Sequence, residues 1–157
     1  MPRFSNPTLR AVASGWRFSP ILRFLSGSWL SVTAGSDLAF NGIANQRANQ
    51  ILPDVYGSKT PDSWLNPRAF ARPAASTFGN MRPATILSPS NRQFDAALSR
   101  EFQFHEGQKM EFRAEAFNVT NSLQLGNPNT SVTSSQFGQI TSGRGARIMQ
   151  FALKYFF

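Results

Sequence analysis

The chain has 157 residues, of which 41% are hydrophobic, and it carries a net charge of +8 from 16 basic and 8 acidic side chains. This hydrophobic fraction is too high for a disordered tail, and the length allows one ordinary domain. The sequence has no cysteine and a single histidine, which excludes disulfides, thiolate metal sites, cysteine nucleophiles and any site that needs two imidazoles from one chain.

The N-terminal part contains a polar segment and a predicted β-strand. Residues 1–10 include two prolines and no apolar stretch, so they do not form a secretory signal, and an exported chain is expected to be part of a longer precursor. The sequence has no apolar run of about 18 residues, which excludes a membrane-spanning helix. Residues 16–25 alternate between large apolar side chains at even positions and a more polar set at odd positions, which predicts a strand that contains Pro20.

A long polar stretch follows over residues 37–91. It is rich in proline, asparagine, glycine and serine, with X-Pro steps such as Asn66-Pro67 and Arg82-Pro83. This composition predicts a long irregular connection. Residues 1–92 also hold ten basic and three acidic side chains, against six and five in residues 93–157, so most of the excess positive charge lies in the first part of the chain.

Two further strands are predicted over residues 93–104 and 110–118. Apolar residues occupy alternate positions in both segments, and Arg100 is the one charged residue on the apolar side. The polar residues between the two segments predict a hairpin turn.

The register of this hairpin depends on the length of its loop. For the apolar residues of both strands to share a face, the loop must have an odd number of residues. A three-residue loop would place Glu101 opposite Glu111, whereas a five-residue loop, residues 105–109, would place Glu101 opposite Arg113. Cross-strand charge pairing favours the five-residue loop.

The C-terminal part consists of a second long polar loop, predicted over residues 119–146, and a last strand over residues 147–157. In this strand every second residue from Met149 to Phe157 is large and either apolar or aromatic. All four predicted strands are about 9 to 12 residues long, which matches a tilted strand that crosses a bilayer and is about twice the usual globular length.

Alternation of this kind fits either a soluble β-sandwich or a membrane-spanning β-barrel. Strand length, one tight turn between two long connections, and aromatic residues at segment ends together favour the barrel. With the C-terminus at the periplasmic side, the tight turn is also periplasmic and both long connections are external. The residues expected to form an interfacial girdle are Trp16, Phe104, Tyr155, Phe156 and Phe157.

The predicted fold class is therefore all-β, an antiparallel transmembrane β-barrel segment of about four strands with long external loops. Four strands cannot close a barrel, because the smallest barrels have about eight strands and an open sheet edge is not tolerated in lipid. The chain is thus expected to be an incomplete barrel, the C-terminal part of a larger one.

The two faces of the predicted strands differ in chemistry, which assigns each residue a side of the barrel wall. The residues predicted to face lipid are Phe94, Leu98, Phe102, Met110, Phe112, Met149, Phe151 and Leu153. Those predicted to face the lumen are Asp95, Glu101, Glu111, Arg113 and Glu115. Because an arginine lies among these carboxylates, a lumen salt-bridge lattice is preferred to a cation site.

Five runs of residues carry a resemblance to a known family. They are residues 64–70, 77–80, 112–121, 126–129 and 137–140. These runs resemble the C-terminal end of TonB-dependent outer-membrane transporters, in particular the Oar-like group, which typically carries a carboxypeptidase-regulatory-like domain near its N-terminus. The likeness covers roughly residues 16–157.

The last eight residues are similar to the signal by which the barrel-assembly machinery recognises its clients. Gln150, Ala152, Tyr155 and Phe157 occupy its positions, and Ala152 stands where glycine is usual. The family resemblance implies energy-coupled uptake of a large or scarce ligand, such as a siderophore or an oligosaccharide, gated by a plug domain. Neither the plug nor the TonB-contacting motif occurs in this sequence, so the chain is expected to supply wall, external loops and assembly signal.

The resemblance also implies the location and the partners. The location is the bacterial outer membrane. The partners are outer-membrane lipid and lipopolysaccharide, the barrel-assembly machinery, the remainder of the barrel and plug on the same longer chain, and TonB only through the absent N-terminal parts. No cofactor, metal or catalytic residue is predicted.

The main alternative is a soluble basic all-β module that binds polyanions such as nucleic acid. The sequence pI near 11.3 and the run 143–147 favour it, but the basic residues are scattered through loops rather than clustered with aromatic residues. Loop arginines that face lipopolysaccharide explain the same charge, so no nucleic-acid partner is expected.

His105 beside Glu106 is the one acid–base pair that an enzyme could use, and in a turn both face water. Residues 118–120 have the form of a glycosylation acceptor, which a bacterial context makes accidental.

Overall fold

The computed structural model describes residues 13–157, so the prediction for residues 1–10 lies outside the described residues. The chain divides into two compact units. The sheet unit comprises residues 13–23, Arg92–Ser122 and Gly145–Phe157, and the core unit comprises Phe24–Asn91 and Leu123–Arg144. Among residues 13–157, no helix has the length and apolar character needed to cross a membrane.

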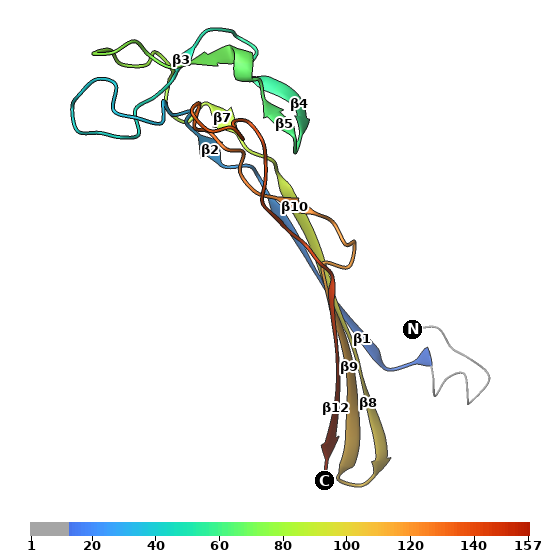
Figure 1. The fold of residues 1–157 in the computed structure, drawn as a ribbon. Coiled ribbons are helices and arrows are strands. Elements are labelled where there is room, and N and C mark those ends of the chain that lie inside the picture. Colours follow the sequence, from blue (N-terminus) through green and yellow to red (C-terminus); the bar gives the residue numbers. More distant parts are fainter. Residues whose placement is uncertain (1–12) are drawn as a thin grey trace. The chain divides into compact units, whose positions relative to one another are not determined.

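Four long strands form a single sheet, and most of their residues belong to the sheet unit (Figure 1). Their spatial order is β1 (Trp16–Leu25), β8 (Asn91–His105), β9 (Gln108–Phe117) and β12 (Ile148–Phe156). Strand β9 pairs antiparallel with both β8 and β12. Trp16 lies near Arg100 and Arg23 contacts Asp95, so β1 also runs antiparallel to β8. The predicted all-β antiparallel fold is confirmed, and the sheet is open at β1 and β12.

The strand bounds follow the alternation in the sequence. Strand β1 has the predicted bounds, β9 and β12 each differ from theirs by one or two residues, and β8 begins two residues earlier and ends one residue later. Strands of 9 to 15 residues are long enough to cross a bilayer, whereas most globular strands are not.

The turn between β8 and β9 differs from the prediction. His105 pairs with Gln108, which leaves a two-residue turn at Glu106 and Gly107 rather than a five-residue loop. Gly107 has a φ of 80°, a left-handed conformation that glycine adopts without steric cost. The register shifts between Gln103 and His105, and this irregularity reconciles the short turn with the shared apolar face.

The resulting register places Glu101 opposite Glu111, so the predicted pairing of Glu101 with Arg113 is wrong. Two carboxylates directly opposite each other repel. The ammonium of Lys109 lies 3.5 Å from the Glu101 carboxylate and offsets this repulsion. Backbone geometry at the turn therefore decides the register, and the Lys109 ammonium compensates for the unfavourable pairing of Glu101 with Glu111.

The stretches 37–91 and 119–146 are more ordered than the predicted irregular loops. They contain most of the short strands of the core unit and a 3-10 turn, η1 (Pro67–Ala69). The strand pairs are β2 (Trp29–Leu30) with β7 (Ile86–Leu87), β3 (Asn49–Gln50) with β6 (Phe70–Ala71), β4 (Tyr56–Thr60) with β5 (Ser63–Leu65), and β10 (Gln124–Leu125) with β11 (Gly143–Arg144).

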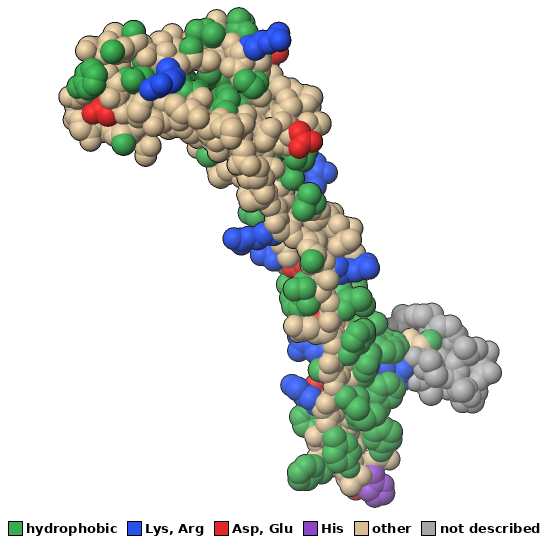
Figure 2. All heavy atoms as spheres, viewed as in Figure 1, with side chains coloured by type: hydrophobic (Ala, Val, Ile, Leu, Met, Phe, Trp, Pro, Cys, Tyr) green, Lys and Arg blue, Asp and Glu red, His purple; other side chains and the backbone are tan. Residues whose placement is uncertain are grey.

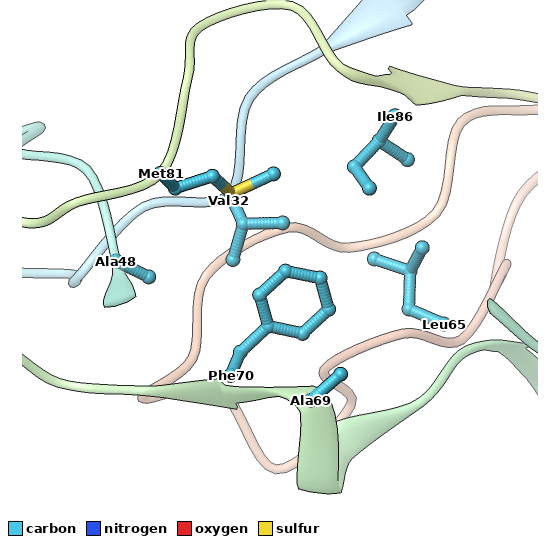
Figure 3. Packing of buried hydrophobic residues seen from close by; sticks show 7 residues of the cluster. All are labelled: Val32, Ala48, Leu65, Ala69, Phe70, Met81 and Ile86. Carbon is cyan, nitrogen blue, oxygen red and sulfur yellow. The ribbon is translucent and has the colours of Figure 1, made fainter. Parts of the chain in front are cut away.

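A small hydrophobic core explains this order. Seven side chains from segments far apart in the sequence meet there, as Figure 3 shows: Val32, Ala48, Leu65, Ala69, Phe70, Met81 and Ile86. The ring of Phe137 contacts the ring of Phe70 edge-on, with centroids 5.6 Å apart. Since Phe137 comes from the second stretch, the two predicted loops share one core.

Candidate functional site

One face of the sheet carries an apolar surface that continues from strand to strand. Each row of this surface takes one residue each from β8, β9 and β12. The rows are Ala96–Ala116–Met149, Leu98–Ala114–Phe151, Arg100–Phe112–Leu153 and Phe102–Met110–Tyr155. Phe94 precedes the first paired row and is half-buried. All eight residues predicted to face lipid therefore lie on this face, by pairing or, for Phe94, by alternation along β8.

On this apolar face the side chains of the outer strands β1 and β12 are exposed, whereas those of β8 and β9 are half-buried. The exposed fractions are 66% for Phe151, 65% for Leu153 and 62% for Leu22 of β1. Figure 2 shows hydrophobic side chains gathered over the strands of the sheet unit near the β8–β9 turn. A soluble sandwich would cover such a face with a second layer. Because the outer-strand side chains remain exposed among residues 13–157, the sandwich interpretation does not fit the sheet.

The one charged residue in these rows, Arg100, lies among aromatic rings. Its guanidinium carbon is 4.5 Å from the ring centroid of Phe102 and 5.6 Å from that of Trp16. The Trp16 ring meets Phe112 edge-on, with centroids 6.2 Å apart. These cation–π contacts place the charge against the negative faces of the rings, and the aliphatic stem of the arginine extends the apolar surface.

The opposite face of the sheet carries ionised side chains. Arg113 pairs with Glu115 at 2.5 Å, and Lys154 lies opposite Glu111 in the register. The predicted lumen-facing residues Glu101, Glu111, Arg113 and Glu115 all occupy this face. Within residues 13–157, no group of three or more acidic, histidine or cysteine side chains could hold a metal ion.

Asp95, the fifth residue predicted to face the lumen, is buried near the end of the sheet away from the β8–β9 turn. Its carboxylate accepts hydrogen bonds from Arg23 at 3.1 Å, from the Gln93 amide at 2.8 and 3.0 Å, and from the backbone N–H of Asn118 at 2.8 Å. A buried carboxylate needs such partners, because transfer out of water removes its hydration. Asp95 thus joins β1, β8 and the end of β9.

Asn118 continues this network toward β12. Its side-chain amide donates to the carbonyls of Ser122, at 3.0 Å, and Gly145, and its side-chain oxygen accepts from the backbone N–H of Ser122 at 3.0 Å. The backbone of Asn118 has a φ of 54°, a left-handed conformation that asparagine tolerates better than most residues. The polar belt, formed by Arg23, Gln93, Asp95 and Asn118, therefore links all four strands or their immediate flanks.

Aromatic side chains gather at the opposite end, beside the β8–β9 turn. Tyr155 stacks on Phe157 with centroids 6.2 Å apart, and the Lys109 ammonium lies 4.9 Å from the ring centroid of Phe156. Phe104 precedes the turn and is exposed. Four of the five predicted girdle residues are therefore near the turn, and Trp16 lies further along the sheet, beside Arg100.

The four residues of the predicted assembly signal divide between the two faces. Gln150 and Ala152 lie opposite Glu115 and Arg113 on the charged face. Tyr155 lies on the apolar face, and the following Phe157 is 98% exposed. Strand β12 pairs only with β9 in the described sheet, so its other edge leaves backbone donors and acceptors available to a further strand.

A long-stranded antiparallel sheet with one exposed apolar face and one ionised face is the wall of a membrane β-barrel. The comparisons agree with this class. A family model described as outer membrane beta barrel domain matches residues 2–150, so the chain belongs to that family. No curated protein and no solved structure matches the chain. The protein is located in the bacterial outer membrane, and the family match does not favour the soluble polyanion-binding module.

The polar belt is the part of the site that the sequence interpretation missed. On the sequence alone, Asp95 is predicted to face the lumen with the other carboxylates. Asn118 lies at the end of the predicted strand over residues 110–118, within a run that carries the family resemblance and within a glycosylation motif, and no structural role is predicted for its side chain. Asparagine directly after an alternating strand is a signal for a left-handed strand end. The partners of its side chain come from residues 122 and 145, which local sequence does not bring together.

Proposed function

We propose that this chain is the C-terminal wall of a TonB-dependent outer-membrane transporter. In this proposal the apolar face of the sheet contacts lipid, the charged face lines the lumen, and the core unit forms the external loops. The resemblance of residues 64–70, 77–80 and 112–121 to such transporters supports the particular class, and the family match supports the barrel.

The single observation that carries the proposal is the contrast between the two faces of one sheet. Covering a large apolar side chain contributes about 1.5–3 kcal/mol relative to leaving it in water. At least four such side chains, Phe18, Leu22, Phe151 and Leu153, are mostly exposed in the chain itself. In this proposal lipid hydrocarbon removes these apolar side chains from water, while the ion pairs of the other face stay in an aqueous lumen.

The ends of the sheet support an orientation. Aromatic residues beside the β8–β9 turn match a girdle at a membrane interface, and tight turns are typical of the periplasmic side of these barrels. The core unit, which has six basic and three acidic side chains, then lies outside, where anionic lipopolysaccharide is the main surface. In this orientation the residues of the assembly signal lie at the periplasmic end of the last strand.

Cysteine labelling tests the assignment of the faces, because the chain has no native cysteine. The matched single variants are Phe151→Cys on the apolar face and Ala152→Cys next to it on the charged face. In a closed barrel that contains these strands, reconstituted in vesicles, a polar, membrane-impermeant maleimide should label position 152 and leave position 151 unlabelled, whereas both should react in urea. Equal labelling of both positions in the folded state contradicts the proposal.

A genetic test addresses the transporter class. An open reading frame that continues upstream of residue 1 and encodes a plug domain and earlier strands supports a TonB-dependent transporter. The longer product should then take up its ligand only in cells that contain TonB. Uptake without TonB contradicts the transporter class but does not contradict the assignment of this chain to a barrel wall. A chain that is soluble without detergent and binds nucleic acid in a salt-sensitive manner would instead establish the polyanion-binding module.

A further inference from the structure

The core unit contains a pocket whose chemistry the barrel wall does not explain. Its volume is about 310 Å³, which is in the range of pockets that hold small ligands. The residues that carry the argument are Gly27, Tyr56, Lys59, Trp64, Ser88 and Ser90. All of them belong to the core unit, so the pocket exists whichever face of the sheet meets lipid.

Two aromatic rings of the pocket are held by the same residue. The backbone N–H of Leu87 donates to the Tyr56 hydroxyl at 2.9 Å, and the Trp64 indole N–H donates to the Leu87 carbonyl at 3.2 Å. Both rings also pack against the hydrophobic core. The rings are therefore fixed in position before any ligand arrives, which lowers the entropic cost of binding.

Lys59 is the one charged residue in the lining of the pocket. The Lys59 ammonium is 4.6 Å from the ring centroid of Tyr56. The backbone of Lys59 has a φ of 57°, an uncommon conformation for lysine, and the β4–β5 register shifts between Tyr56 and Thr60. Irregularities of this kind redirect side chains and are concentrated at binding sites. Here the irregular backbone directs the lysine over the tyrosine ring.

Another part of the pocket lining is formed by a close approach of two backbone segments, at Gly27 and Ser88. A Cβ atom at Gly27 would lie 1.9 Å from the carbonyl oxygen of Ser88, so only glycine fits there. The Ser88 hydroxyl accepts a hydrogen bond from the backbone N–H of Ser28 at 2.8 Å and locks this contact. Ser90 adds a hydroxyl group to the lining.

We propose that this pocket binds a small ring-shaped carboxylate. The carboxylate would pair with the Lys59 ammonium, the ring would lie against the Trp64 indole, and any hydroxyl group that the ligand carries would bond to serine. Both a sugar acid and an aromatic acid have this chemistry, and a neutral ring of the same size lacks the group that the lysine recognises. The proposal goes beyond the wall function and does not depend on it.

Ligand titrations on the full chain in detergent micelles test this site. The probes are glucuronate and benzoate, with glucose and benzyl alcohol as neutral counterparts, and binding is measured by ligand-observed NMR. At least one carboxylate should bind in preference to its neutral counterpart. The variant Lys59→Gln should weaken that binding about tenfold, because it removes a charge-assisted hydrogen bond, and Lys59→Arg should retain most of it.

Two further variants keep the result interpretable. Lys154→Gln removes a lysine from the sheet unit and should leave binding unchanged, whereas Trp64→Leu should weaken it. Binding of glucuronate alone identifies a sugar acid, and binding of benzoate alone identifies an aromatic acid. The site is refuted if neither carboxylate binds, if the neutral ring binds equally well, or if Lys59→Gln and Lys154→Gln have the same effect. None of these outcomes bears on the labelling at positions 151 and 152.

Discussion

The sheet unit and the core unit place their apolar side chains in opposite locations. In the core unit Leu65, Met81 and Ile86 are almost completely buried, and most strands are two or three residues long. In the sheet unit the strands are several times longer, and Phe151 and Leu153 are mostly exposed. One region thus encloses its hydrophobic residues, and the other presents them outward.

This difference shows that hydrophobic content alone does not predict burial. The hydrophobic effect requires only that apolar surface leaves water, and a lipid bilayer satisfies this requirement as well as a protein core does. In lipid the backbone must also be fully paired, which demands long, continuous ladders. The core unit can interrupt its strands, because water and side chains satisfy its backbone groups.

The largest expected effect tests whether the core unit depends on its enclosed residues. Replacing the buried Leu65 by alanine should lower the free energy of unfolding of the core unit by about 2–5 kcal/mol, since the change leaves a cavity. Hydrogen exchange measured by mass spectrometry on peptides from this unit reports the change. The exposed Leu52→Ala should shift stability by no more than about 0.5 kcal/mol. Similar effects at both positions would show that the hydrophobic core does not stabilise the core unit.

A charge on the apolar face tests the sheet unit in the same way. Phe151→Arg should destabilise the folded state in vesicles by about 2–4 kcal/mol, because the arginine must enter hydrocarbon. Gln150→Arg is the matched control, since the new side chain lies opposite Glu115 on the charged face. Urea titrations of vesicle-inserted protein measure both. If Gln150→Arg were the more harmful variant, the assignment of the faces would be reversed.

The polar belt should matter more than the ion pairs of the charged face. Asp95→Ala leaves the buried N–H of Asn118 without its acceptor and should lower the free energy of unfolding of the sheet unit by about 1–3 kcal/mol. Glu115→Ala breaks the more exposed pair with Arg113 and should lower it by about 0–1 kcal/mol. The same urea titrations apply, and equal losses for the two variants would show that the belt has no special role.

The smallest effect concerns the turn between β8 and β9. Gly107→Ala should cost about 1 kcal/mol, because alanine resists the left-handed conformation even where no neighbour obstructs its side chain. Glu106→Ala, at the adjacent turn position, should be close to neutral. A stabilising effect of Gly107→Ala in the vesicle titration would mean that the turn adopts a different conformation in the membrane.

Much of the sheet was predictable because alternation has a period of two and depends only on neighbouring residues. The four strands, their shared apolar face and the position of Arg100 on it all follow from this period. The predicted pairing of Glu101 with Arg113 is wrong, because cross-strand charge pairs contribute little to the choice of register compared with the turn preference of Glu106 and Gly107. The polar belt was missed because Asp95 and Asn118 are separated by 23 residues and meet only after β8 and β9 pair.

The sequence by itself determined that this chain makes long strands with one apolar and one charged side, because a strand presents alternate residues to opposite faces. Only the tertiary structure decided that residues 37–91 and 119–146 fold around a common core, because that core is assembled from contacts such as Phe70 with Phe137 that span many residues. The same holds for the exposure of the apolar face. Alternation alone is compatible with a second layer of protein over this face, and only the structure shows that residues 13–157 supply no such layer over Phe151 and Leu153.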